Sequence, residues 1–69
     1  MTQVFVNGQA QSLAADTTIA ELVRSLGRDP DRAGTAIARN GEVVPRRVWP
    51  DVVLDDGDAV EVVTAVGGG

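Results

Sequence analysis

The fold is decided by residues 18–27, which read TIAELVRSLG. Their apolar residues recur at the i, i+3, i+4, i+7 spacing of one helical face, at Ile19, Leu22, Val23 and Leu26. Thr18 and Glu21 have the spacing of a capping box, in which each side chain accepts a hydrogen bond from the other residue's backbone N–H. Gly27 ends the helix, since glycine readily adopts the conformation that follows a helical C-terminus. The chain therefore centres on one short amphipathic helix.

A β-hairpin is predicted on each side of this helix. Both turns are Asn-Gly pairs, the strongest short hairpin signal, at Asn7-Gly8 and Asn40-Gly41. The strands expected around them cover residues 2–7 and 10–14 before the helix, and 35–39 and 42–44 after it.

The remainder of the chain predicts one more strand. Residues 46–54 show no clear periodicity and are expected to be irregular, with Trp49 in the core. The stretch Asp55-Asp56-Gly57-Asp58 is interpreted as a solvated turn, because its glycine is at the third position and an EF-hand calcium loop needs one at the sixth. Residues 59–66 alternate and form the last and strongest strand.

The order of these elements indicates the fold class. One helix cannot cover both faces of a sheet, so it packs on one face and leaves the other in water. Two strands, a helix and further strands with the last one central resemble the β-grasp plan of ubiquitin. We expect an α+β fold, a mixed sheet of four to five strands with one main helix packed on one face. Residues 1–66 are predicted to form this domain, and residues 67–69 a flexible C-terminal glycine tail.

Composition excludes several classes of function. The 69 residues include no cysteine, histidine or lysine, which removes disulfides, thiolate metal sites, cysteine nucleophiles and the usual neutral-pH base. The net charge of −4 disfavours nucleic acid, whose phosphates need a basic face. No apolar run approaches the roughly 20 residues that span a membrane. We expect a cytoplasmic protein, monomeric when free, with no catalytic residues and no bound metal or cofactor.

Strand alternation predicts a docking face. Val4 and Val6 share one side of the first strand, and Phe5 points to the open side of the sheet. Val63 of the last strand should share that open side. Single exposed apolar residues are ordinary, but clustered ones mark interfaces. Phe5 and Val63 are therefore the predicted partner-docking face, whereas the facing of Arg39 is left open.

The glycine run Gly67-Gly68-Gly69 is the predicted working end. Glycine has no Cβ, so such a run can enter a narrow channel in another protein. Ordering it costs about 1–2 kcal/mol per residue, which a partner must recover. A carboxylate is a poor electrophile until it is joined to a leaving group such as AMP, after which sulfur or nitrogen can attack. Without cysteine, the chain could carry sulfur only as a thiocarboxylate on Gly69. The plainer alternative is a frayed terminus.

Several segments spread over the whole chain carry a family resemblance. They are VFVNG at 4–8, TIAEL at 18–22, AIARNGEVVPR at 36–46, Trp49, and DGDAVEVVTAVGGG at 56–69. Together they resemble the ThiS family, small bacterial sulfur carriers of thiamin biosynthesis. Each segment alone is a weak signal, and their combination is specific. Arg39 departs from the pattern, which favours an apolar residue there.

The resemblance implies a reaction sequence carried out by other proteins. An E1-like adenylyltransferase (ThiF-like) would use ATP to adenylate the carboxylate of Gly69. A persulfide, supplied through a cysteine desulfurase or another source, would convert it to a thiocarboxylate, and a thiazole synthase (ThiG-like) would take the sulfur. Gly68 matches the penultimate family glycine, and Gly67 extends the arm. The face with Phe5 and Val63 would meet these enzymes in turn.

Other functions share the same features. A β-grasp sulfur carrier for molybdopterin, cysteine or tRNA thiolation has the same tail and a different recipient. A ubiquitin-like conjugation tag would join its glycine carboxylate to target lysines. A third alternative is an interaction module with an inert tail.

Overall fold

The computed structural model describes residues 1–29 and 34–64. Its elements follow the predicted order of two strands, a helix, two strands and a last strand. They are β1 (Thr2–Val6), β2 (Gln9–Leu13), α1 (Ile19–Ser25), β3 (Thr35–Arg39), β4 (Glu42–Val44), the 3₁₀-helix η1 (Arg46–Asp51) and β5 (Ala59–Thr64). No helix within these two ranges is long and apolar enough to cross a membrane.

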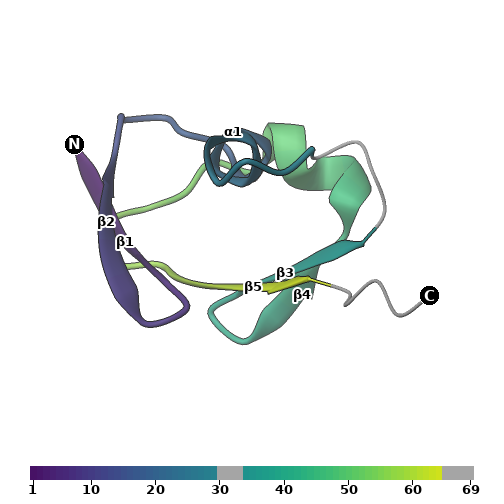
Figure 1. Ribbon diagram of the computed structural model, residues 1–69. Helices are drawn as coiled ribbons and strands as arrows, with labels where there is room; N and C mark the ends of the chain where they lie inside the picture. The colour runs from purple at the N-terminus through teal and green to yellow at the C-terminus, as the bar shows by residue number, and fades with distance from the viewer. Residues whose placement is uncertain (30–33, 65–69) are drawn as a thin grey trace.

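The five strands form one mixed sheet with β5 at its centre. The strand order is β2-β1-β5-β3-β4. β1 runs parallel to β5, and the other three pairs are antiparallel. Both α1 and the green η1 lie on one side of this sheet (Figure 1). The α+β class, the central last strand and the single main helix are therefore confirmed.

Local sequence signals determine the turns and the helix start. Both hairpin asparagines have positive φ, 49° at Asn7 and 51° at Asn40, and each is followed by a glycine with positive φ, as a type I′ turn requires. At the helix start, the backbone N–H of Glu21 donates to Thr18 Oγ1 at 3.2 Å, and the N–H of Thr18 donates to Glu21 Oε1 at 2.9 Å. The capping box is thus confirmed.

The core lies between the helix layer and the inner face of the sheet. Trp49 is buried there as predicted, and its Nε1 donates to the carbonyl oxygen of Val44 at 2.8 Å. The apolar residues around it are Val4, Val6, Ile19, Ala20, Leu22, Val23, Ile37, Leu54 and Val60. Burial of these side chains is the main stabilising contribution to a domain of this size.

Four predicted segments differ from the observed elements, the first of them β1, which ends at Val6 instead of residue 7. Residues 46–54 were expected to be irregular, but 46–51 form η1, whose turns are closed by Val48 N–H to Pro45 O and Val52 N–H to Trp49 O. β2 begins at Gln9 instead of residue 10, because a two-residue turn leaves no further residue unpaired. The described part of the last strand ends at Thr64, and residues 65–66 lie outside the described residues.

The acidic turn before β5 is built into the fold, so its interpretation as a solvated turn was wrong for Asp58. This side chain is buried and accepts hydrogen bonds from Arg39 Nε at 2.7 Å, from Asn40 Nδ2 at 3.0 Å and from the N–H of Asp55 at 2.8 Å. Burial raises the pKa of Asp58, but the bonds from Asp55, Asn40 and Arg39 outweigh it and hold that pKa below its ordinary value. A buried carboxylate needs such partners to stay ionised.

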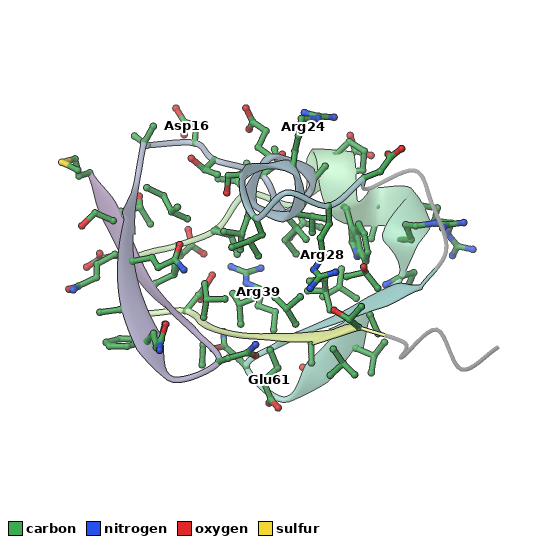
Figure 2. All side chains as sticks on the ribbon, viewed as in Figure 1. Asp16, Arg24, Arg28, Arg39 and Glu61 are labelled. Carbon is green, nitrogen blue, oxygen red and sulfur yellow. The ribbon has the colours of Figure 1, made fainter. Side chains whose placement is uncertain are left out.

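Arg39 is the partner that links this turn to the sheet. Its Nη2 also donates to Asp55 Oδ2 at 2.8 Å. Figure 2 shows Arg39 between α1 and the sheet. It alternates with Ala38 along β3 and so shares the inner side with Ile37. The unexpected arginine therefore points inward, where two aspartates neutralise it.

Candidate functional site

The open face of the sheet carries both predicted docking residues. Phe5 pairs with Ala59, so it lies on the same side as Ala59, Glu61 and Val63, which alternate along β5. Figure 2 shows Glu61 on the side of the sheet away from α1. Phe5 is 42% exposed and Val63 is 61% exposed. The predicted facing of both residues is confirmed.

Phe5 and Val63 are nevertheless separate features of this face. Val63 is four residues beyond Ala59, the neighbour of Phe5, which corresponds to about 13 Å along a strand. Val63 instead pairs with Ala36 of β3. The two residues therefore mark different ends of the open face.

A second exposed valine lies on the same open face as Val63, across β3 from β5. Val43 is 77% exposed and pairs with Ala38 of β3, two residues along from Ala36. We call Val43, Val63, Ala36 and Ala38 the valine patch. Sequence reasoning missed Val43 because it left the facing of Arg39 open, and the facing of β4 depends on that of β3. Glu61, which pairs with Ala38 and shares this face, borders the patch, and Val63 is the patch residue nearest the end of β5.

The end of β5 is held by a side chain from the first hairpin. Oδ1 of Asn7 accepts the N–H of Val62 at 2.8 Å, and Nδ2 of Asn7 donates to the carbonyl oxygen of Val62 at 3.2 Å. Sequence reasoning identified Asn7 only as a turn residue. The contact spans 55 positions, and no local pattern indicates it.

Two open recesses lie on the other side of the sheet. Arg24, Arg46 and Arg47 line one of them, above Trp49 and Pro50. The other lies beside the end of β5, with Asn7, Arg28 and Thr64 in its lining. Neither contains a nucleophile paired with a base. In residues 1–29 and 34–64, no three histidine, cysteine or acidic side chains are grouped so as to hold a metal ion.

The predicted reactive residues Gly67, Gly68 and Gly69 lie outside the described residues. The structure describes the body up to Thr64, five residues before Gly69. In that body Val63 of the valine patch and the Asn7–Val62 contact both belong to the last three described residues of β5, on opposite sides of the sheet. Phe5 does not join this group.

Known proteins match this chain over nearly its whole length. The ThiS family matches residues 4–69. The sulfur carrier protein ThiS of Escherichia coli is 37% identical over 67 residues, which cover 97% of this chain and 98% of that protein. A crystal structure of the thiamine biosynthesis protein ThiS from Geobacter metallireducens superposes with a TM-score of 0.78 at 31% identity, over 99% of this chain and 100% of that one.

Two much longer proteins contain a similar stretch. The thiazole synthases of Paramagnetospirillum magneticum and Magnetococcus marinus are 34% and 37% identical to this chain over 67 residues. In each case the match covers 97% of this chain and 20% of the synthase.

Proposed function

Because the chain belongs to the ThiS family, we propose that it is a sulfur carrier of thiamin biosynthesis that holds its sulfur as a thiocarboxylate on Gly69. The observation that carries this proposal is the extent of the family match, which runs from residue 4 through the terminal glycine. The β-grasp fold shared with the Geobacter metallireducens protein supports it. In this proposal residues 1–66 are the body, and residues 67–69 are a flexible tail.

The proposed chemistry takes place in partner active sites. A carboxylate oxygen of Gly69 attacks the α-phosphorus of ATP, pyrophosphate leaves, and an acyl adenylate forms. The terminal sulfur of a persulfide then attacks the carbonyl carbon and AMP leaves. A thiol cleaves the resulting S–S bond, which leaves –COS⁻ on Gly69. The body contributes binding and delivery, so the chain is a co-substrate and not an enzyme.

The partners follow from this chemistry. An E1-like adenylyltransferase (ThiF-like) would supply the ATP-dependent step in the cytoplasm, with a cysteine desulfurase as the indirect source of persulfide. A thiazole synthase (ThiG-like) would take the sulfur. Two thiazole synthases that contain a stretch similar to this chain support that pairing, because a carrier joined to its recipient delivers sulfur at high effective concentration.

The proposal is tested by incubating the chain with such an adenylyltransferase, ATP and a persulfide source. The intact mass should increase by the difference between one sulfur and one oxygen atom. The loaded chain should then supply sulfur to a thiazole synthase and not to a molybdopterin synthase. Sulfur transfer only to the latter would favour another thiolation pathway, and an unchanged mass with several adenylyltransferases would reject the carrier function.

The open face is proposed as the surface that these enzymes bind. Val63→Asp places a charge in the valine patch and should raise the Kd for the adenylyltransferase at least about tenfold, since the loss of an apolar anchor residue at an interface costs about 2 kcal/mol or more. Phe5→Asp should have a smaller effect, because Phe5 lies at the far end of the face. Binding can be measured by isothermal titration calorimetry.

Val53→Asp is the matched control for this prediction. Val53 is 41% exposed, close to the exposure of Phe5, but it pairs with Thr18 beside α1 and not with the open face. The substitution Val53→Asp should therefore leave the Kd for the adenylyltransferase unchanged. A Kd equally raised by Val53→Asp and Val63→Asp would mean that negative charge, and not the valine patch, decides the affinity.

A further inference from the structure

Asn7 makes contacts that its hairpin turn does not require. A type I′ turn needs a residue that tolerates positive φ, and glycine meets that need as well as asparagine does. The side chain of Asn7 nevertheless reaches β5, where it accepts from the N–H of Val62 at 2.8 Å and donates to its carbonyl oxygen at 3.2 Å. One planar amide thereby satisfies both backbone groups of Val62.

These contacts lie beyond the paired part of β1. The parallel register joins Phe5 to Ala59 and Val6 to Val60. The N–H of Asn7 still donates to the carbonyl oxygen of Val60 at 2.9 Å. The side-chain amide therefore takes the place of one further strand residue and extends the pairing from Val60 to Val62.

The other hairpin provides a comparison at the opposite end of the same strand. Asn40 occupies the equivalent turn position with nearly the same φ. Its Oδ1 accepts from the N–H of Ala59 at 2.9 Å, and its Nδ2 donates to Asp58 Oδ1 at 3.0 Å. Asn40 thus holds the beginning of β5, and Asn7 holds the end from which the chain continues toward Gly69.

We propose that Asn7 is a positioning residue for the Gly69 carboxylate, because it holds Val62 on the β1 side of β5 while β3 pairs with the strand up to Thr64, and so steadies the strand end from which the chain continues. This inference rests on the proposed sulfur-carrier function. Five residues follow Thr64, the last described residue of β5, and fully extended they reach at most about 18 Å. Without the Asn7 contact, residues 62–64 keep their pairing with β3 but lose their support on the β1 side. The end of β5 then opens more readily, and the loading enzyme must order it again on binding, at an entropic cost.

Asn7→Gly removes the contact and keeps the turn. Because the added ordering occurs on binding, the KM of the chain for the adenylyltransferase should rise about tenfold, the equivalent of fixing roughly one more backbone residue, while kcat stays close to its original value. ATP-dependent pyrophosphate release measures both constants. Hydrogen exchange at the amide of Val62 should become faster under native conditions. Asn7→Asp, which keeps the acceptor and loses the donor, should give an intermediate KM.

Asn40→Gly is the matched control, since it makes the same change in the same turn type at the other end of β5. It should lower overall stability but leave the KM and the native-state exchange of Val62 unchanged. If Asn7→Gly speeds exchange at Val62 and keeps the original KM, or if Asn40→Gly raises the KM equally, the positioning role is refuted while the carrier function stands. Failure of the unsubstituted chain to be adenylated would refute the carrier function, and the positioning role with it.

Discussion

Replacement of the C-terminal carboxylate by an amide should abolish sulfur loading completely. An amide at Gly69 has no anionic oxygen to attack the α-phosphorus of ATP, so no acyl adenylate can form and the persulfide has no activated carbonyl to attack. A chain of 69 residues is short enough to be made by chemical synthesis with either terminus. Intact mass and pyrophosphate release are the measurements, and loss of signal should be total for the amidated chain.

The synthetic chain with a free carboxylate is the control, and far-UV circular dichroism of both chains checks that they fold alike. Removal of one glycine is a weaker test, because the shortened chain still ends in Gly-Gly and differs chiefly in reach. Sulfur uptake by the amidated chain would place the sulfur on another group and contradict the assignment to Gly69.

Asp58→Ala should produce the largest loss of stability among substitutions in the polar network. It removes the acceptor for Arg39, Asn40 and the backbone of Asp55, and leaves a partly buried guanidinium with one exposed partner. A hydrogen bond to a charged group contributes about 1.5–3 kcal/mol. Because solvent reaches Arg39 and reduces the sum of these bonds, we expect Asp58→Ala to lower the free energy of unfolding by about 2–3 kcal/mol. A domain of this length has on the order of 5 kcal/mol in total. Urea denaturation measures the difference.

Asp55→Ala is the control that separates burial from charge. Asp55 and Asp58 contact the same arginine at 2.8 Å and 2.7 Å, but their side chains are 78% and 9% exposed. An exposed pair contributes about 0–1 kcal/mol, so Asp55→Ala should cost no more than that. Equal losses for the two substitutions would contradict the expectation that burial makes the difference.

Acid should weaken the fold through the same carboxylate. The pKa of Asp58 in the folded chain lies below its ordinary value of 3.8, so its contribution is fully present above 3.8 and is lost as the pH falls through the lower folded-state value. The free energy of unfolding should therefore decline as the pH falls below about 4. Asp58→Asn should show a shallower decline. The acid dependence that remains in Asp58→Asn comes in part from Glu21, whose pKa is lowered by the hydrogen bond that it accepts from the backbone of Thr18.

Features that depend on neighbouring residues could be predicted from the sequence. Asn-Gly determines both hairpin turns, Thr18 and Glu21 determine the helix start, and alternation along β1 and β5 gives the facing of Phe5 and Val63. Trp49 could be assigned to the core because a small domain has few other residues of that size. The role of the glycine tail stays a prediction, because residues 67–69 lie outside the described residues.

Features that depend on distant residues could not be predicted. The inward facing of Arg39 is decided by Asp58, 19 positions later, and the facing of Val43 follows from it. The extra contacts of Asn7 and Asn40 are made to β5, which no local pattern relates to either turn. η1 packs against α1 and holds Trp49 in the core, and both contacts join segments that are far apart in the sequence.

The central place of β5 also dictates when the protein can fold. The β1–β2 and β3–β4 hairpins each close through their own turns, so each can form early. Their inner edges then lack a partner, and unpaired strand edges attract other chains. Only β5, the last of the five strands to be synthesised, fills the space between them, and its pairing of Ala59 with Phe5 closes a loop that spans most of the sequence. We therefore expect folding to wait until residues 59–64 have emerged from the ribosome. A chain that stalls before them should expose the unpaired edges of β1 and β3, which can pair with other chains.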